Sequence, residues 1–586
     1  MQDAQLQIPA RRELDERVQQ EHRIGAARNR DTDTIPRVEH VITGDSFENS
    51  FKQHSDSIRI LTDLSILTLD AGSSSVRTLL YDENARQVQG FGSQLAYEAT
   101  TTADGGVEID ANKLLALAVR SLSDIHGQMQ SAGKRPAAFG FSTFWHNVLG
   151  VDASGQAVTP IVHPFDTRSA GAAKKLATRI DEAAQHSRTG CVLHPSYWPS
   201  KLLWLSETQP DIFHRVKKWM SFGEYFFLKL FGKAIASTSM VSGSGLWNQN
   251  QNDYDAETLS VLPIDRSQLC PVDQVDQPMT ELGSEYRQMW PQFAGMSWFS
   301  ALGDGACDNI GSGCLTPDRF ALMVGTSGAM RAVCETESMR IPAGLFCYRV
   351  DRRRFVLGGA LSNGGEVYHW MKRTLLLPDD ASIESQLAAM QPGAHGLTVL
   401  PLFAGERSTK WRADARAAIT GMSVHTGPME ILRASLESVA LRFRNIFEIM
   451  LGEIGEPREI VDSGTALLHS PAWTQMMADA LGCPVIPCLE KEATSRGAAL
   501  LAMERIGAIE HVRDRPAAMG PAVQPAPAHR PIYEEELRRQ RRLYAKLFEE
   551  NRHPWGGRSC HLPAPQALRS RADGTTVRSF VMKHCI

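Results

Sequence analysis

Two short stretches of this chain share one pattern, and they lie 253 residues apart counted from Gly72 to Gly325. In residues 66–77 and 322–331, an apolar, β-prone run leads into a glycine, a cluster of hydroxyl residues and then an arginine. Glycine lets the backbone turn sharply and expose its N–H groups, and the hydroxyls add further donors. Aligned N–H dipoles in such a turn form a concave site for phosphate oxygens. One Gly-Ser turn is most often only a turn, but the matched pair predicts two related domains that hold one polyphosphate between them.

The size and composition of the chain indicate a two-domain protein of ordinary type. At 586 residues it is longer than one hydrophobic core usually supports. With 42% hydrophobic residues, 22% charged residues and a net charge of −4, it lacks the basic character expected of a nucleic-acid binder. No apolar run approaches the roughly 18 residues of a membrane span. We therefore expect neither a nucleic-acid nor a membrane partner.

The ten cysteines are scattered and lack the spacing of zinc sites. The charged N-terminus is not followed by a hydrophobic signal core. These features predict reduced thiols in a cytoplasmic protein.

Changes in composition along the chain suggest four parts. Residues 1–62 are polar and predict a mobile extension. We expect the two large domains at 63–315 and 316–510, and then a Pro/Ala linker (516–531), a charged helix (534–551) and a basic tail within 511–586. The clearest predicted elements are strands at 66–70, 76–81, 88–93, 138–142, 148–152 and 319–324, and a helix at 112–132.

Neither of the better-known phosphate-binding motifs is present. The nearest P-loop candidate, around Gly133 and Lys134, lacks both the preceding glycine at the required distance and the following hydroxyl. No GxGxxG follows a predicted strand, which disfavours a dinucleotide site. What remains is a strand, a Gly/Ser turn and a second strand, with phosphate held against a hairpin.

Residues 69–77 resemble the opening phosphate loop of the FGGY carbohydrate kinases, which belong to the superfamily of actin, hexokinase and the heat-shock chaperone ATPases. The resemblance covers about residues 64–505, and further motifs follow in the family's order at 141–152, 166–168, 303–311, 324–328, 403–411 and 464–473. It implies an α/β protein of two ribonuclease-H-like (actin/hexokinase-type) domains with a nucleotide and sugar cleft between them. It also implies ATP-dependent phosphorylation of a sugar or sugar-acid hydroxyl, with ATP and Mg²⁺.

Asp304 is the residue to which the resemblance assigns catalysis as general base. Phosphoryl transfer to a sugar hydroxyl needs an acceptor for the hydroxyl proton close to the attacking oxygen. The alternative is a helix N-cap, because Asp followed by Gly-Ala-Cys-Asp-Asn-Ile begins a helix well. Both roles can coexist in one residue.

The resemblance assigns the nucleotide to segments rich in glycine and hydroxyl residues. Asp70 is expected near Mg²⁺ through water, although it could instead be a turn aspartate. The segment at 364–365 could be a plain glycine-rich turn, and Arg77 could lie on a solvated strand face. In the adenosine segment, Asp462 and Ser463 replace glycines usual in the family, which leaves the tightness of nucleotide binding open. The predicted nucleotide-binding residues are Gly72, Ser73, Ser74, Arg77, Gly325, Thr326, Ser327, Gly364, Gly365, Gly464, Thr465 and Ala466.

The resemblance also predicts a sugar cleft, in which aromatic faces pack against C–H groups and polar ends select hydroxyls. The Trp-His pair and the Asp-Gly of the catalytic segment are more similar to gluconate kinases than to glycerol or xylulose kinases. A sugar acid needs a cation for its carboxylate, which Arg168 or Lys201 could supply. Phe165 replaces a tryptophan common in the family, Trp145 could simply pack in the core, and Lys201 could be a surface charge. The predicted substrate-binding residues are Trp145, His146, Asp166, Arg168 and Lys201.

Two functions outside sugar phosphorylation remain as alternatives. An ATP-binding pseudokinase or carbohydrate sensor would explain the altered adenosine segment and the N-terminal extension, but it has no chemical need for Asp304. A phosphatase of the same superfamily lacks support from the sugar-side motifs. Within the kinase prediction, gluconate is the first expected substrate, with xylulose, glycerol or another polyol as alternatives, and a homodimer is left open.

Overall fold

The structure is a computed structural model and describes residues 64–273 and 276–550. The expected extension at 1–62 and the tail beyond residue 550 lie outside the described residues, so the predictions for them stay predictions.

A six-stranded mixed sheet forms the centre of the first domain. Its strands are β1 (Ser65–Ala71), β2 (Ser75–Asp82), β3 (Gln87–Ala96), β6 (Ala138–Thr143), β14 (Ser297–Trp298) and β15 (Leu302–Gly303). β1, β2 and β3 form an antiparallel meander, whereas β6 pairs in parallel with β1 and with β14 and β15. β1 lies in the interior of the sheet and is almost entirely buried, as expected for a strand with both faces covered.

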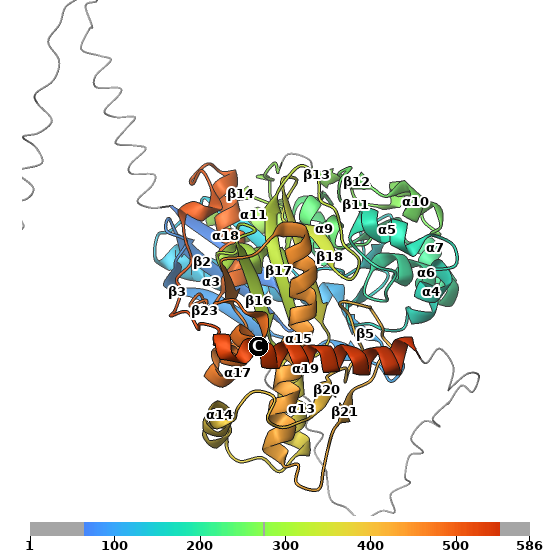
Figure 1. Ribbon diagram of the computed structural model, residues 1–586. Helices are drawn as coiled ribbons and strands as arrows, with labels where there is room; N and C mark the ends of the chain where they lie inside the picture. The colour runs from blue at the N-terminus through green and yellow to red at the C-terminus, as the bar shows by residue number, and fades with distance from the viewer. Residues whose placement is uncertain (1–63, 274–275, 551–586) are drawn as a thin grey trace, which may run out of the picture. The chain divides into compact units, whose positions relative to one another are not determined.

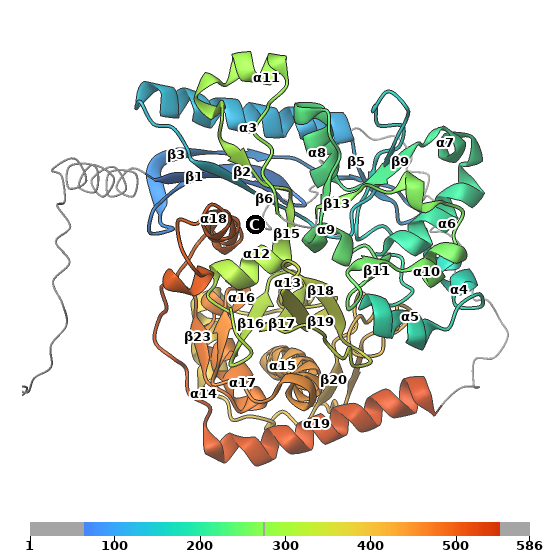
Figure 2. The same ribbon diagram turned by 90° about the horizontal axis from the view of Figure 1, so that it is seen from above.

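Helix α3 (Ala111–Ser131) covers one face of this sheet (Figure 2). Asp110 begins the helix, because its carboxylate accepts hydrogen bonds from the N–H groups of Asn112 and Lys113 at 2.9 and 3.0 Å. Its buried apolar residues recur every three or four positions and form one stripe that faces β2 and β3. They are Leu114, Ala118, Leu122, Ile125 and Met129.

The second domain repeats the strand order of the first around its own six-stranded sheet. Its strands are β16 (Arg319–Val324), β17 (Gly328–Glu335), β18 (Phe346–Arg349), β19 (Arg354–Leu361), β22 (Glu459–Asp462) and β23 (Val485–Pro487). β16, β17 and β19 pair antiparallel side by side, with β18 at the edge beyond β19, and β22 and β23 continue in parallel from β16. β1, β2, β3 and β6 thus correspond to β16, β17, β19 and β22, which confirms the prediction of two α/β domains built alike.

Helices and two short strands surround the second sheet. The long helix α15 packs against β17, β19 and β20. These elements are α13 (Gly365–Thr374), α14 (Asp380–Ala389), β20 (Thr398–Leu400), β21 (Ala418–Thr420), α15 (Pro428–Ile454), α16 (Thr465–Leu468) and α17 (Pro471–Leu481).

Two helices join the domains, α12 (Asp304–Gly311) and α18 (Ala493–Arg505). They pack on each other with Gly311 and Gly497 at the crossing, and α18 also packs against β1 and β6 (Figure 2). Although α18 follows the last strand of the second sheet, its buried residues belong to the hydrophobic core of the first domain. The start of α12 therefore lies where the two domains meet.

Smaller elements extend the first domain beyond its sheet. They are β4 (Thr100–Thr101), β5 (Val107–Ile109), β7 (Leu149–Val151), β8 (Ile161–Val162), α4 (Ala170–Leu176), α5 (Glu182–Thr189), α6 (Trp198–Thr208), α7 (Pro210–Arg215), β9 (Lys218–Met220), α8 (Phe222–Phe231), β10 (Ala236–Ser237), α9 (Thr238–Ser242), β11 (Trp247–Asn248), β12 (Asp253–Tyr254), α10 (Ala256–Ser260), β13 (Val272–Asp273) and α11 (Ser284–Met289).

The segment expected to be a linker is irregular but follows the edge of the second sheet. Met519 and Val523 form β-bridges with Cys488 and Val485, respectively. The predicted charged helix is present as α19 (Arg530–Tyr544), followed by a π-helical turn, Ala545–Glu549. Because α19 packs on α15, α17 and β20 (Figure 1), this part of the chain is held against the second domain.

The predicted strands and the helix at 112–132 all have counterparts, within a few residues at their ends. The eight cysteines in the described part of the chain are free and buried. No helix within residues 64–273 and 276–550 is long and apolar enough to cross a membrane.

Candidate active site

The two glycine loops occupy equivalent positions in the two sheets. The loop of Gly72 joins β1 to β2, and the loop of Gly325 joins β16 to β17. In each, the glycine N–H bonds back across the turn, at 3.0 Å to the Ser75 carbonyl and at 2.9 Å to the Ser327 carbonyl. Hydroxyl side chains are exposed at both tips, on Ser73, Ser74 and Thr326.

The glycine-rich start of α13 lies directly against the second loop. Gly364 and Gly365 donate their N–H groups to the carbonyls of Thr326 and Gly325, at 3.0 and 2.6 Å. This segment is therefore more than a free turn, because it fixes the shape of the loop predicted to bind phosphate.

Gly464 brings the predicted adenosine segment to the same place. A β-carbon on Gly464 would lie only 2.1 Å from the backbone nitrogen of Val324, so only glycine allows this approach without a shift. Thr465 and Ala466 then begin α16. The structure thus brings together all three segments of the second domain that the sequence assigns to the nucleotide.

Asp462 and Ser463, which replace the expected glycines, have structural contacts. Asp462 is buried, and its carboxylate accepts the N–H of Gly464 at 2.9 Å. Burial raises the pKa of Asp462 to about 8. The Ser463 hydroxyl donates to Asp308 at 3.4 Å. Asp462 therefore organises the turn.

Asp304 is the first residue of α12, and Gly303 takes the N-cap position in its place. Its carboxylate accepts the N–H of Gly305 at 2.8 Å and is only partly exposed. Burial raises the pKa of Asp304, opposed by the positive charge of Arg331 and by backbone N–H groups, including that of Trp145. A partly buried carboxylate with a raised pKa at a domain junction is suited to accept a proton.

Arg331 connects the second domain electrostatically to the start of α12. It extends from β17 and lies 3.5 Å from the carboxylate of Asp308, one turn beyond Asp304. One of its terminal nitrogens is buried without a hydrogen-bond partner in the described part of the chain. This nitrogen is Nη1, the one that faces Asp308, and the charge of Arg331 also acts on Asp304.

Asp70 lies near the end of β1, opposite Ser142 on β6 and Arg77 on β2. The Ser142 hydroxyl donates to it at 2.5 Å. Burial raises the pKa of Asp70 to about 6, helped by the negative charge of Asp304 and opposed by Ser142 and Arg77. The two carboxylates predicted to act on the metal and on the proton are therefore electrostatic neighbours.

Arg77 is directed to a carboxylate of the protein itself. It forms an ion pair with Glu492, the N-cap residue of α18. Its side chain is 13% exposed, so it is not on a solvated strand face.

Trp145 packs against the segment that contains Asp304. Its ring is buried, and its indole N–H donates to the carbonyl of Ser239 at 2.8 Å. A β-carbon on Gly303 would lie 1.9 Å from this ring, so the indole packs directly on the backbone before Asp304. Trp145 therefore packs in the core, directly beside the start of α12.

His146 adopts a left-handed backbone conformation with φ of 67°. Its Nδ1 lies 2.5 Å from the carbonyl of Gly243, and its ring lies 4.9 and 5.2 Å from the rings of Tyr197 and Tyr348. Burial lowers the pKa of His146 to about 3, helped by Lys201. The imidazole is therefore neutral near pH 7, and the hydrogen bond to Gly243 assigns the proton to Nδ1.

Lys201 is fully buried, in contrast to a surface charge. Its ammonium group donates to the carbonyls of His146 and Val162 at 2.9 and 3.4 Å. Burial lowers the pKa of Lys201 to about 7, opposed by Asp166. This residue supports the strained backbone at His146 from inside.

Asp166 and Arg168 form a network within the protein. The Arg168 guanidinium donates to Asp166 at 2.7 Å and to Glu108 at 2.5 Å, and it stacks on Trp204 at 4.5 Å. Asp166 also accepts the N–H of Val107 at 2.9 Å. Both cations that the sequence offers to a substrate carboxylate, Arg168 and Lys201, thus have protein partners.

Several residues near the site had no assigned role in the sequence analysis. Arg331 and Arg407 stand within the quoted motifs, so their position was visible, but their side-chain environment was not. Tyr348 lies on β18 and had no sequence signal. Its hydroxyl bonds that of Tyr197 at 2.6 Å, from a different part of the chain.

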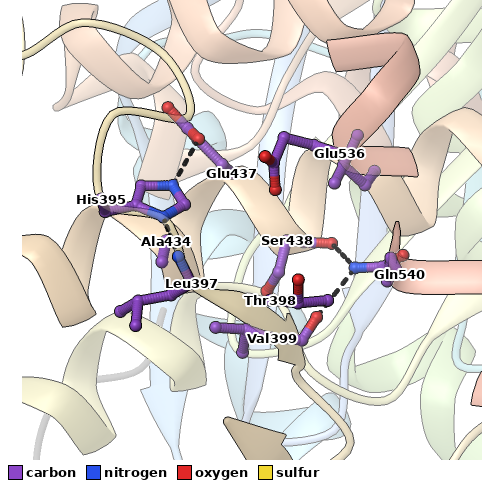
Figure 3. A pocket seen from close by; sticks show the side chains of 10 residues that line it. His395, Leu397, Thr398, Val399, Ala434, Glu437, Ser438, Glu536 and Gln540 are labelled. Atoms are coloured by element: carbon purple, nitrogen blue, oxygen red, sulfur yellow. Dashed lines mark hydrogen bonds and ion pairs between the residues drawn. The ribbon is translucent and has the colours of Figure 1, made fainter. Parts of the chain in front are cut away.

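A small cavity lies away from this site, between α15, β20 and α19 (Figure 3). Nε2 of His395 is 2.9 Å from the carboxylate of Glu437, and the amide of Gln540 donates to the carbonyls of Val399 and Ser438 at 3.0 and 3.1 Å. The hydrogen bonds of Gln540 hold α19 against the second domain.

Two domains with the same strand order, a glycine loop at the same place in each, and a carboxylate at their junction define the architecture of a two-domain sugar kinase. Residues 65–311 match the N-terminal domain of the FGGY family of carbohydrate kinases, and residues 320–504 match its C-terminal domain. The chain belongs to the FGGY family of carbohydrate kinases. It is an enzyme that phosphorylates a carbohydrate at the expense of ATP.

The chain is similar to kinases with different named substrates. It is 26% identical over 462 residues to a gluconokinase of Bacillus subtilis (strain 168), covering 76% of this chain and 88% of that protein. It is 28% identical over 465 residues to a glycerol kinase of Agrobacterium fabrum, covering 75% and 90%. Among solved structures, gluconate kinase from Lactobacillus acidophilus matches with a TM-score of 0.77 at 24% identity, covering 82% of this chain and 98% of that one. That likeness supports the fold.

Proposed function

We propose that this carbohydrate kinase transfers the terminal phosphoryl group of ATP to a hydroxyl of gluconate, with Asp304 as general base. One observation supports this most: Asp304 begins the helix at the domain junction, within electrostatic range of Asp70 from the first domain and Arg331 from the second. The gluconokinase relatives support gluconate as acceptor. Xylulose and glycerol are the alternative acceptors, because xylulose and glycerol kinases are also among the relatives.

In the proposed reaction, the acceptor hydroxyl gives its proton to Asp304 as its oxygen attacks the terminal phosphorus of ATP. The new O–P bond forms as the bond between that phosphorus and the oxygen of ADP breaks. Burial makes Asp304 a stronger base, while Arg331 and nearby N–H groups favour its ionised form. The N–H and hydroxyl groups of the loops at Gly72 and Gly325 bind phosphate oxygens.

We further propose that Mg²⁺ lies beside Asp70, with water between them. In the described ranges, no group of three or more His, Cys, Asp or Glu side chains could hold a metal ion. The single partly exposed carboxylate of Asp70 fits an ion that takes its other ligands from water and phosphate, as Mg²⁺ does. When bound, Mg²⁺ neutralises phosphate charge.

On the acceptor side, we propose that His146 binds a sugar hydroxyl as a neutral imidazole. Lys201 and Trp145 position His146 and Asp304 from within the protein. ATP as co-substrate and free buried cysteines support a cytoplasmic location.

A substrate panel tests this proposal. ADP release would be measured with gluconate, other aldonic acids, xylulose and glycerol as acceptors, with Asp304→Asn as control. We expect the highest kcat/KM for gluconate and no acceptor-dependent ADP release from the variant. A folded wild-type protein that is inactive on gluconate and active on xylulose or glycerol would contradict the substrate assignment.

A further inference from the structure

Arg407 lies on a loop of the second domain that reaches the substrate side of the first. Its carbonyl accepts the N–H of Trp411 at 2.6 Å, and the Trp411 ring lies 5.6 Å from His194 and 6.4 Å from Tyr197. Its guanidinium donates to the carbonyl of Leu361 at 2.8 Å, where β19 ends beside the glycine-rich start of α13. The side chain is therefore anchored between the nucleotide segments and the substrate side.

Arg407 has no counter-charge of its own in residues 64–273 and 276–550, where no carboxylate forms an ion pair with it. Its sequence neighbour Glu406 pairs instead with Arg442 and accepts the hydroxyl of Tyr544 at 2.5 Å. Burial lowers the pKa of Arg407, as does the nearby charge of Arg331. An anionic ligand would offset this electrostatic cost.

The other cations near the cleft differ from Arg407. Arg168 pairs with two carboxylates, the ammonium group of Lys201 is enclosed by carbonyl groups, and Arg331 faces Asp308. Lys201 and Arg407 are the two of these four that form no ion pair within the described residues. Lys201 is fully buried, whereas Arg407 is partly exposed, so Arg407 is the one that a ligand can reach.

The surroundings of Arg407 belong to the substrate side. Its charge acts on the hydroxyls of Tyr197 and Tyr348 and on the imidazoles of His146 and His194. The two tyrosine hydroxyls bond each other at 2.6 Å, and both rings contact His146. This cluster can offer hydroxyl and imidazole groups to a polyol chain but no further positive charge near pH 7.

We infer that Arg407 binds the carboxylate of the sugar-acid substrate and so determines the preference for acids over neutral polyols. This inference rests on the proposed function, in which the acceptor is gluconate. A guanidinium suits the task because it can form two parallel hydrogen bonds to one carboxylate.

The C-terminal part of the chain holds this loop in place. Besides the contact of Tyr544 with Glu406, Arg412 donates to the carbonyl of Phe548 at 2.6 Å. Both C-terminal residues lie beyond the match to the FGGY C-terminal domain, which ends at residue 504. α19 and the turn after it thus pre-position Arg407 for its ligand.

Arg407→Gln tests the inference in the full-length enzyme. KM and kcat would be measured for gluconate, for its neutral amide gluconamide and for ATP, and gluconate binding by calorimetry. We expect KM for gluconate to rise roughly 10- to 100-fold, as for loss of a charged hydrogen bond, while the constants for ATP and gluconamide change little. Arg416→Gln is the matched control, because Arg416 is exposed on the same segment and contacts only local carbonyls.

Each outcome bears on the inference. An unchanged gluconate KM in folded Arg407→Gln, with wild type active on gluconate, overturns the inference alone. A raised KM for ATP with unchanged gluconate binding also overturns it and makes Arg407 a phosphate ligand. Wild type active only on neutral sugars overturns the substrate assignment and the inference together. If Arg407→Gln does not fold, the same constants are measured for Arg407→Lys. In addition, the kcat/KM of wild type for gluconate is divided by its kcat/KM for gluconamide, and a ratio near one contradicts the inference.

Discussion

The two glycine loops are matched in sequence and in topology, but their arginines have different partners. In the first domain, Arg77 pairs with Glu492 at the start of α18. In the second, Arg331 faces Asp308, and its charge acts on Asp304. The first arginine therefore joins β2 to the helix between the domains, whereas the second acts on the carboxylate that we propose as general base. The shared fold gives both domains the same glycine loop, but the helix beside each loop determines which carboxylate its arginine contacts.

A second difference concerns carboxylates. The first domain contributes Asp70 and Asp304 to the junction, each partly exposed and with a raised pKa. The second domain instead has Asp462, at the end of β22, inside the protein and against the N–H of Gly464. We therefore expect the first domain to carry the proton and metal chemistry and the second to hold the nucleotide through its backbone.

Replacing Asp304 with asparagine should have the largest effect. Loss of a general base costs about 10²- to 10⁴-fold in kcat. Nucleotide binding should persist, because it depends on the two glycine loops and on the glycine segments of the second domain. A coupled ADP assay with nucleotide titration calorimetry measures both. Turnover close to wild type would break the assignment of the chemistry to the first domain.

The two loop arginines should respond differently to the same substitution. Arg331→Met should lower kcat about 100-fold, as for removal of one preorganised donor at a developing charge. Arg77→Met should instead lower the free energy of unfolding by about 1–3 kcal/mol and affect kcat much less. Both variants would be compared by kcat and by thermal unfolding. If Arg77→Met mainly lowered kcat and Arg331→Met mainly lowered stability, the roles assigned to the two arginines would be wrong.

Asp462→Asn should change stability in a pH-dependent way. The pKa of Asp462 is raised to about 8, so the folded protein retains a proton that the unfolded chain releases near pH 4. The favourable contribution of this proton is complete below about pH 4 and is lost progressively as the pH rises from 4 to 8. The variant cannot ionise at this position, so we expect its stability advantage over wild type to be larger at pH 9 than at pH 5 by roughly 2–4 kcal/mol. If the difference in stability between the variant and wild type were the same at both pH values, Asp462 would be ionised in the folded protein at both.

The smallest expected effect is a shift in the pH dependence of kcat/KM. Because burial raises the pKa of Asp304, activity should fall on acidification at a higher pH than for an ordinary aspartate. The dependence of kcat/KM on pH, measured with a stability control at each pH, should show this loss of activity on the acidic side. A profile that stays flat down to the ordinary range of aspartate would indicate that the reacting carboxyl is not desolvated.

The sequence predicted the elements that depend on local pattern. Apolar alternation located β1 and β2, and the spacing of apolar residues located α3. The motif order predicted that the segments at Gly325, Gly364 and Gly464 would serve one nucleotide, and the structure brings these segments together.

Side-chain environments could not be predicted in the same way. Lys201 is buried beneath His146, and Arg168 forms an ion pair with Glu108. Both contacts join residues that are far apart in the sequence. The uncompensated charge of Arg407 depends on Glu406 pairing with Arg442 and Tyr544, residues far along the chain. Composition likewise predicted a linker at 516–531, although its backbone bridges the edge of the second sheet at Val485 and Cys488.

The most direct test of the central claim is a crystal structure with gluconate and a non-hydrolysable ATP analogue with Mg²⁺. We expect the phosphates to lie between the loops of Gly72 and Gly325, with an acceptor hydroxyl within hydrogen-bond distance of Asp304. Phosphates bound by one loop alone, or an acceptor hydroxyl remote from Asp304, would contradict the account.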